Sequence, residues 1–384
     1  MAGIDEVFGD LADPRTGNAK RHLLHEVVVI ALCTVLCGGE NCADMALFGR
    51  SKQAFLQEFL RLEHGIPSHD TFSRVFRLLD PAAFHAWFLG FMRRFAETCQ
   101  GVIAIKPAPA KAGGKTMRRS FDRASAASPL HLVSAWAADQ LRAKTASPAL
   151  VLGQIAVDDK SNEIIAVPKL LELLSLTGCI VTADAMSCQR KIAQQVIDQG
   201  GDYVLALKGN QGRLHDDVRR FLDDPETVLA SATDTDKGHG RIEVRTASLT
   251  TDIAWLQEDH LWPGLTAIGK ITASREIDGR TGSDTRYYLL STALTPESFN
   301  AAVRSHWGVE NQLHWRLDVI MDEDQARNRK DHGPENLALL RKLVLNLAKL
   351  EPSKTSLRAK LKQAGWDNAF LAQILAQFVN LQMR

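Results

Sequence analysis

Residues 179–208 read CIVTADAMSCQRKIAQQVIDQGGDYVLALK, and this stretch decides the fold class. Two runs, 179–186 and 202–208, are rich in the apolar and β-branched residues that are typical of buried strands. Between them, residues 188–199 have helical spacing, and Gly200 and Gly201 mark the end of that helix. A strand, a helix and a second strand in this order predict two parallel strands joined by a crossover helix.

Three more strand candidates precede this unit, at residues 102–105, 130–138 and 150–157. No helical pattern separates these three, whereas residues 168–176 form a helical pattern just before the fourth strand. Consecutive strands followed by alternating helices and strands predict a mixed sheet. The expected fold class is therefore α/β, with a mixed sheet and flanking helices.

The remaining chain alternates between helical and strand-rich parts, with one turn dipeptide at Asp278–Gly279. These changes of pattern divide the sequence into five units. We expect a helical N-terminal domain at 1–98, a sheet domain at 99–225, a strand-rich region at 226–292, a helical region at 293–350, and a helical tail at 351–384.

The N-terminal helices carry the first hint of a partner. Residues 27–36 predict a buried helix and residues 45–62 an amphipathic one. A further helix follows Pro67, with Ser68 or Asp70 as its N-cap, and exposes Arg74 and Arg77. Such a short helix could enter a DNA groove. A packed helical bundle with solvated arginines explains the same pattern.

Composition limits the classes of function. The formal net charge is +1, with 45% hydrophobic and 24% charged residues, so no global basic field indicates a nucleic-acid partner. The longest apolar run, residues 27–37, is far shorter than the roughly 18 residues of a membrane span, and no signal peptide pattern opens the chain. None of the six cysteines forms a CxxC pair. We expect a cytoplasmic protein with no membrane partner.

Asp184 is the first candidate catalytic residue, because it follows a buried strand within residues 179–186. The carboxyl ends of strands are where open α/β sheets present their functional groups. An alternative role is structural, since an aspartate here could also serve as the N-cap of a helix that begins near Ser187. Position alone does not choose between the two roles.

Glu310 is the second candidate, since it lies within the apolar stripe of a predicted helix. An unpaired carboxylate there would cost several kcal/mol of desolvation. Glu310 therefore requires a cation, a metal or a cleft, and His306 and His314 lie four residues before and after it. The alternatives are an ion pair with Arg304 or Arg341 and, because HExxH is absent, a less favoured His–Glu–His zinc site.

Several clusters of basic, polar and aromatic residues flank the cleft predicted between these carboxylates, and binding of a phosphate backbone needs such distributed cations. Each cluster alone is more often a solvated surface, and Trp307 or Trp315 could equally fill a core or stack on bases. The residues that we predict to contact DNA are Lys115, Arg118, Lys208, Asn210, His306, Trp307, Asn311 and His314.

Two carboxylates that converge on an α/β sheet suit Mg²⁺ or Mn²⁺, which prefer oxygen ligands. Phosphoryl transfer with two metals would use them to activate water and to stabilise the leaving oxygen. A third carboxylate is normally expected on the first, central strand. The strand VIAI at residues 102–105 carries none.

These segments resemble the DDE-class transposases of the ISAs-type insertion sequences, the H-repeat-associated proteins. The resemblance spans residues 7–350. The matching motifs include GIPSHDTFSRVFRLLDP, GKTMRRSFDRA, LVLGQIAVDDKSNEI, IVTADAMSCQ, GGDYVLALKGNQ, DKGHGRIEVR and RSHWGVENQLHW. It implies a ribonuclease H-like domain, a strand-rich insertion, and a DDE triad that binds two divalent metals and cuts and rejoins double-stranded DNA at element ends. Asp184 and Glu310 match the second and third members of that triad.

The first member of the triad is missing. Between the strand and the GKT motif the family has an aspartate, where this chain has KPAPAKAG at residues 106–113. Asp122 does not replace it, because the family has the RSFD motif as well as that aspartate. We therefore expect a protein that folds and binds element ends, with impaired cleavage. The alternatives are a competent transposase with a substitute carboxylate and a DNA-binding remnant without enzymatic activity. A homodimer on DNA is compatible with each.

Overall fold

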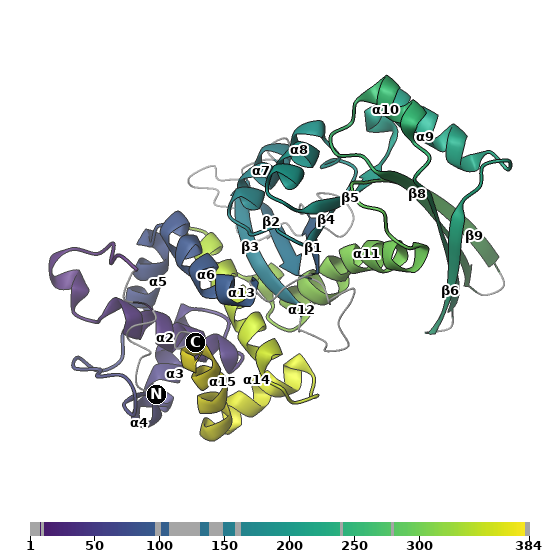
Figure 1. The fold of residues 1–384 in the computed structure, drawn as a ribbon. Helices are drawn as coiled ribbons and strands as arrows, with labels where there is room; N and C mark the ends of the chain where they lie inside the picture. Colours follow the sequence, from purple (N-terminus) through teal and green to yellow (C-terminus); the bar gives the residue numbers. More distant parts are fainter. Residues whose placement is uncertain are drawn as a thin grey trace.

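The computed structural model describes residues 8, 11–96, 101–106, 131–137, 149–157, 163–238, 241–277 and 280–380. The strands among them form a nine-stranded sheet in the order β3-β2-β1-β4-β5-β9-β8-β7-β6 (Figure 1). Their bounds are β1 Val102–Lys106, β2 His131–Ala137, β3 Leu150–Val157, β4 Ile180–Ala183, β5 Asp202–Leu207, β6 Ala230–Gly238, β7 Arg241–Thr250, β8 Ala267–Ile277 and β9 Arg280–Leu290.

The first five strands form the predicted mixed sheet. β1 pairs antiparallel with β2, and β2 pairs antiparallel with β3. β1, β4 and β5 are parallel, with Ile105 paired with Ala183 and Ala183 with Leu205. The five strands thus form a mixed sheet in which β2 is antiparallel to both of its neighbours. The prediction of a mixed sheet with flanking helices is confirmed.

The strands of the region predicted to be an insertion, β6 to β9, continue the same sheet. β9 pairs antiparallel with β5, with Val204 opposite Leu290, and β8, β7 and β6 follow by antiparallel pairing. Ile277 pairs with Arg280, as the predicted Asp278–Gly279 turn requires, although those two turn residues lie outside the described residues. The sequence pattern does not predict β6, because its residues, ASATDTDKG, lack an apolar face.

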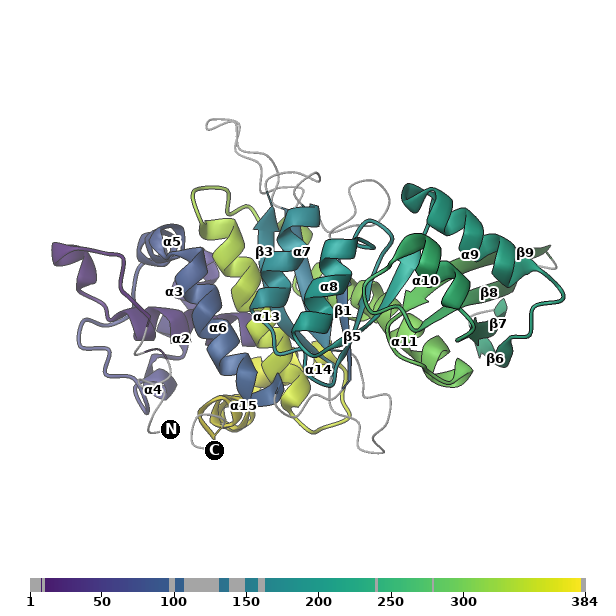
Figure 2. The same cartoon turned by 45° about the horizontal axis from the view of Figure 1, so that its top comes forward.

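Helices cover both faces of the core sheet (Figures 1 and 2). α7 (Glu163–Glu172) packs on β2 and β3, and α8 (Arg190–Asp198) packs on β5. On the other face, α11 (Pro296–Gly308) contacts β1, β4, β6 and β7. The remaining helices near the insertion are α9 (Arg213–Asp223) and α10 (Ala254–His260). The sheet therefore has an apolar layer on each side.

α7 differs from its prediction. The apolar pattern placed the helix at residues 168–176, but it spans Glu163–Glu172 with Pro168 in its interior. A proline is usual in the first turn of a helix, and that preference misplaced the predicted start. The carbonyl of Pro168 accepts a hydrogen bond from the side-chain amide of Gln195 at 2.9 Å, which ties α7 to α8.

The N-terminal helices are α2 (Leu24–Leu36), α3 (Cys42–Ser51), α4 (Gln53–Leu56), α5 (His69–Leu78) and α6 (Pro81–Ala96). The prediction of a single helix over residues 45–62 is wrong. The chain instead folds back toward α2 after α4, which buries Leu60 and Leu62. The carboxylate of Glu26 accepts a hydrogen bond from the Leu62 N–H at 2.7 Å and fixes this turn. Ser68 caps α5 as predicted, by accepting from the Thr71 N–H.

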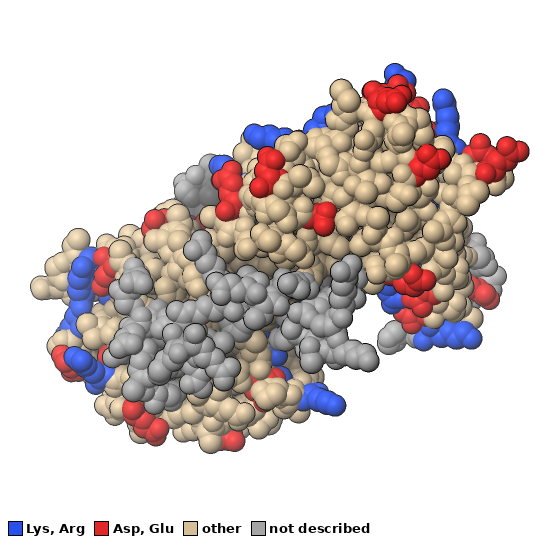
Figure 3. Space-filling view, in the orientation of Figure 1, with Lys and Arg blue, Asp and Glu red and all other residues tan. Residues whose placement is uncertain are grey.

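The C-terminal helices connect the N-terminal helices to the sheet. α13 (Gly333–Leu350) contacts β3 as well as α2, α5 and α6, and α14 (Leu357–Trp366) and α15 (Asn368–Asn380) pack beside it. Among the described residues no helix is long and apolar enough to cross a bilayer. Figure 3 shows positive and negative side chains interspersed over one face, in keeping with the net charge of +1.

Candidate active site

Asp184 lies directly after β4, between the ends of its parallel neighbours β1 and β5. Its side chain is half-buried, and its Oδ1 accepts a hydrogen bond from the Ser187 N–H at 3.3 Å. α8 begins at Arg190 with Gln189 as its N-cap, so Asp184 does not cap that helix. The predicted capping role is therefore wrong, and the carboxylate stands at the strand edge that presents functional groups.

Glu310 lies in a π-helical segment, Val309–His314, between α11 and α12 (Trp315–Val319). The apolar stripe in the sequence predicted a regular α-helix here. A π-helical turn closes i→i+5 hydrogen bonds, is rare, and is frequent at functional sites. The wider turn within Val309–His314 changes the spacing between Glu310 and His314, whereas His306 lies before it in regular α11.

A cavity of about 300 Å³ brings Asp184 and Glu310 together. Its wall also contains Lys208, His306 and Trp307, three of the residues predicted to contact DNA. The other lining residues come from β4, β5, β9 and α11 and from the loop after β4: Thr182, Ala183, Ala185, Val204, Ala206, Arg286, Tyr288 and Val303. Segments that are far apart in the sequence thus form one site.

Neither arginine proposed as a partner of Glu310 is available for that pairing. Arg304 pairs with Asp234 at 2.6 Å and with Asp236 at 3.0 Å. Arg341 lies 3.9 Å from the carboxylate of Glu323. Glu310 is half-buried and lines a cavity. This position agrees with the prediction that its carboxylate requires a cleft if it has no cation or metal.

His306 and Trp307 support the wall of the cavity. Nδ1 of the buried His306 lies 3.2 Å from Oγ1 of Thr182, and this hydrogen bond joins α11 to β4. The guanidinium of Arg286 lies 4.7 Å from the ring centroid of Trp307. Cation–π contacts of this kind orient an aromatic ring. Arg286 and Tyr288 were not among the predicted site residues, although alternation along β9 would have placed both on one face.

The remaining predicted residues have different positions. The Asn210 side-chain amide donates to the carbonyl of Ala185 at 2.8 Å, so it holds the loop that follows Asp184. His314 is buried and, like Asn210, is not part of the cavity lining. Asn311 lies in the π-helical segment. Lys115 and Arg118 lie outside the described residues. DNA contacts by these residues stay predictions.

The charge in the cavity comes from carboxylates and basic side chains. Burial raises the pKa of Tyr288 to about 12. Burial, assisted by the carboxylate of Asp184, also raises the pKa of the nearby Cys188 thiol to about 12. Both groups are therefore neutral at pH 7.

The oxygen donors suit a hard divalent cation in kind, because Mg²⁺ and Mn²⁺ prefer carboxylates. The cavity contains two such carboxylates, those of Asp184 and Glu310. Within the described residues no group of three or more His, Cys, Asp or Glu side chains is arranged to hold a metal. Asp122 and residues 107–113 of the segment 106–113, in which the resemblance implies an aspartate, lie outside the described residues.

A second cavity, of about 610 Å³, adjoins the first. It lies over insertion strands β7, β8 and β9 and shares five lining residues with the first cavity: Arg286, Tyr288, Val303, Trp307 and Glu310. Glu310 therefore stands where the core site meets a groove over the insertion.

Two family descriptions match the chain. The Transposase DDE domain matches residues 143–347, and the DDE_Tnp_1-associated domain matches residues 6–92. Both Asp184 and Glu310 fall within the first match. The strand β1 and the segment that lacks the aspartate fall between the two matches.

Relatives from Escherichia coli (strain K12) extend the match to nearly full length. The chain is 37% identical over 368 residues to the "H repeat-associated putative transposase YhhI", with 92% of this chain and 93% of the relative covered. It is 36% identical over 379 residues to the protein YbfL, with 95% and 96% covered. A solved structure of a piggyBac transposase synaptic complex with hairpin DNA aligns with a TM-score of 0.41 at 10% sequence identity. The alignment covers 99% of this chain and 77% of that one. A similarity at this level supports no functional argument. By the domain match and these relatives, the chain belongs to the DDE-class insertion-sequence transposase family.

Proposed function

We propose that this protein binds double-stranded DNA at the ends of an insertion sequence, and that it cleaves and transfers strands weakly or not at all. One observation carries this proposal: Asp184 and Glu310, which match two members of the family triad, line the same cavity. Lys208 in the cavity wall supplies positive charge for a phosphate group, and Arg286 adds a cation whose charge is offset by Asp284 at 2.8 Å.

In this proposal Asp184 and Glu310 hold Mg²⁺ or Mn²⁺. When bound, such ions activate water and stabilise the leaving oxygen of the scissile phosphate. The half-buried carboxylates are held by the chain itself, since Asn210 fixes the loop after Asp184 and α11 fixes the approach to Glu310. Rigid placement of both groups favours productive geometry.

The impairment follows from β1. Ile105 pairs in parallel with Ala183, so position 106 stands level with position 184 at the same edge of the sheet. The family has an aspartate in this region, whereas this chain has Lys106 followed by Pro107. A site with two of three carboxylates binds metal more weakly and neutralises less charge in the transition state.

The test uses the full chain and duplexes from the two non-coding flanks of its gene, with scrambled duplexes as controls. We expect tighter binding to the flanks than to the scrambled DNA, and no cleavage or strand transfer with Mg²⁺ or Mn²⁺. Equal binding to both duplexes contradicts end recognition. Robust cleavage that is abolished by Asp184→Ala or Glu310→Ala contradicts the impairment and favours a substitute carboxylate.

Metal binding has its own readout, which is Mn²⁺ titration followed by electron paramagnetic resonance. Asp184→Asn and Glu310→Gln should each weaken Mn²⁺ binding. Glu297→Gln is the matched control, because Glu297 is exposed at the start of the same helix, α11, outside the cavity. If neither site variant differs from this control, the assignment of the two carboxylates is wrong.

A further inference from the structure

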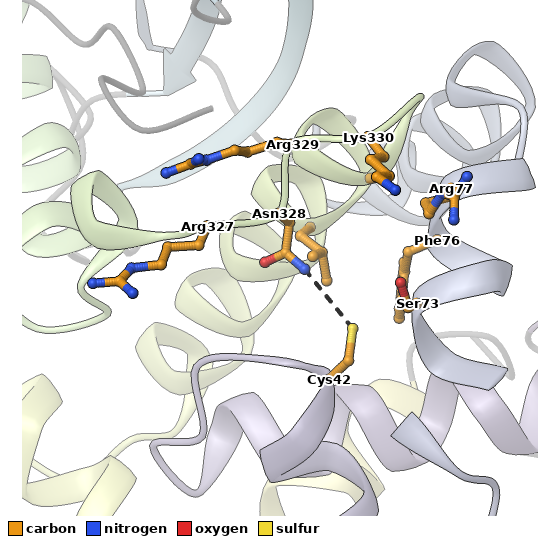
Figure 4. Close-up of a pocket in the computed structure, with 10 residues that line it drawn as sticks. Cys42, Ser73, Phe76, Arg77, Arg327, Asn328, Arg329 and Lys330 are labelled. Atoms are coloured by element: carbon orange, nitrogen blue, oxygen red, sulfur yellow. Dashed lines mark hydrogen bonds between the residues drawn. The ribbon is translucent and has the colours of Figure 1, made fainter. Parts of the chain in front are cut away.

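A third cavity, of about 380 Å³, lies where the N-terminal helices meet the C-terminal part of the core (Figure 4). One wall is α5, which contributes Ser73, Phe76 and Arg77. The other wall is the loop of residues 327–330 with the start of α13. This cavity shares no lining residue with the two cavities around Glu310.

Four cationic side chains surround this cavity: Arg77, Arg327, Arg329 and Lys330. Asp331 offsets one of them, since its carboxylate pairs with the Arg77 guanidinium at 2.7 Å. Arg327, Arg329 and Lys330 are exposed, and neither Arg327 nor Lys330 pairs with a carboxylate of the described residues. The surface therefore carries a local excess of positive charge that the overall charge of +1 conceals.

The cations are spread out rather than aimed at one point. Figure 4 shows Lys330 beside Arg77 at one end of the cavity, while Arg327 and Arg329 extend in a common direction away from it. A single small anion is best held by groups that converge. A row of phosphates, as in a DNA backbone, is better matched by cations distributed along a surface.

The loop is fixed in place by contacts to the N-terminal helices. The Asn328 amide donates to the Cys42 thiol at 3.8 Å, and the His332 N–H donates to the carbonyl of Arg77 at 3.4 Å. The Asn336 amide donates to the carbonyls of Phe76 and Leu79. A surface that is ordered in advance loses less entropy when a ligand binds.

The same loop is linked to the candidate active site through the chain. The helix that carries Glu310 continues into α12, a short turn at Glu323–Gln325 follows, and the loop begins two residues later. Phosphate contacts fix the register of a protein on a duplex without reading its sequence. A backbone phosphate held here would therefore help to fix the register of the protein on the duplex.

We propose that Arg77, Arg327, Arg329 and Lys330 form a binding surface for the phosphate backbone of double-stranded DNA, separate from the carboxylate cavity. This inference rests on the proposed function, because it assigns a second contact surface to the same DNA. In this inference the junction between the N-terminal helices and the core positions the DNA and takes no part in the cleavage reaction.

The experiment measures binding of the full chain to a fluorescent 30-base-pair duplex by anisotropy, over a range of salt concentrations. The test variant is Arg327→Ala/Lys330→Ala, which leaves the Arg77–Asp331 pair intact. The control is Arg219→Ala/Arg220→Ala on α9, which removes the same charge from exposed positions at the other end of the molecule. Melting followed by circular dichroism verifies that both variants fold.

We expect the test variant to bind more weakly and to reduce the slope of log K against log[salt] by about two, roughly one for each phosphate that its missing cations no longer neutralise. The control should keep the wild-type slope.

Equal slopes in test variant and wild type overturn this inference and leave the proposed function standing. Absence of duplex binding by the wild type overturns both. Displacement of the duplex by inorganic phosphate, beyond the effect of sodium chloride at equal ionic strength, also overturns it and indicates a site for free phosphate.

Discussion

The hydroxyl of Thr182 and Nδ1 of His306 lie 3.2 Å apart, and their hydrogen bond joins β4 to α11. Thr182 stands two residues before Asp184, and His306 four residues before Glu310. The two candidate metal ligands are thus held together by a buried link between their supporting elements, next to the cavity that both line.

Removal of this link should destabilise the fold measurably. Thr182→Val keeps the shape of the side chain and deletes the hydroxyl from a buried imidazole, which we expect to cost about 1–3 kcal/mol in the free energy of unfolding. Urea titration followed by circular dichroism measures it. Thr246→Val is the control, because the Thr246 hydroxyl pairs with Thr233 at the surface, where the loss should stay within about 0.5 kcal/mol. Equal costs for the two variants would contradict a buried structural link.

A carboxylate added at the end of β1 should strengthen metal binding. Positions 106 and 184 each follow the last pair of β1 and β4, Ile105 with Ala183, so we expect Lys106→Asp to add a third carboxylate at this edge of the sheet. We expect Mn²⁺ to bind more tightly, on the order of tenfold or about 1.4 kcal/mol. Lys106→Asn removes the positive charge without adding a ligand and is the control. The prediction fails if both variants bind Mn²⁺ with the same affinity.

Asn210 should act on metal binding without touching the ion. Asn210→Ala deletes the hydrogen bond to the carbonyl of Ala185 and frees the loop after Asp184. Loss of such a supporting bond typically weakens a metal site by about 10–100-fold. The readout is Mn²⁺ affinity. Gln194→Ala is the control, since its amide bonds only along the exposed face of α8, to Asp198. Unchanged affinity in Asn210→Ala, with Asp184→Asn impaired, would exclude the positioning role.

Stability should fall at acidic pH in part through Glu351. Burial raises the pKa of Glu351, but hydrogen bonds from Ser353 and Lys360 outweigh it and hold this pKa below its usual value. Because the folded-state pKa is the lower one, the carboxylate stabilises the fold above about pH 4.3, and this contribution is lost as the pH falls through the folded pKa. We expect the free energy of unfolding to decrease between pH 6 and pH 3.

The partner Lys360 provides a sharper form of the same test. Nζ of Lys360 lies 3.0 Å from Oε2 of Glu351, and both side chains are buried. Lys360→Met leaves a buried charge without its cation, which should cost about 3 kcal/mol at pH 7 and less at pH 3, where the carboxyl is neutral. Lys362→Met, exposed on the same helix, should change little. A cost that is independent of pH would contradict the ion pair.

Much of the fold could be predicted from the sequence, because strands buried on both faces appear as apolar runs and crossover helices have apolar spacing. The two carboxylates could also be found, since one follows a buried strand and the other interrupts an apolar stripe. The local sequence pattern does not predict structural features that depend on contacts between distant parts of the chain. The turn of the chain at Leu62, the polar strand β6 and the π-helical segment at Glu310 all belong to that class.

The cationic loop at residues 327–330 shows another limit of sequence reasoning. Its residues, RNRK, resemble an ordinary solvated turn, and Arg77 lies on a predicted helix far away in the sequence. Only the fold places them around one cavity.

The pairing of β9 with β5 constrains how this chain can be shortened. If residues 226–292 were removed, β5 would become an edge strand with a row of unpaired N–H and C=O groups. Its apolar residues would then offer a template for pairing with other chains, and the shortened protein should aggregate. We therefore predict that the strands of residues 226–292 also protect β5 from self-association, whether or not the protein cuts DNA.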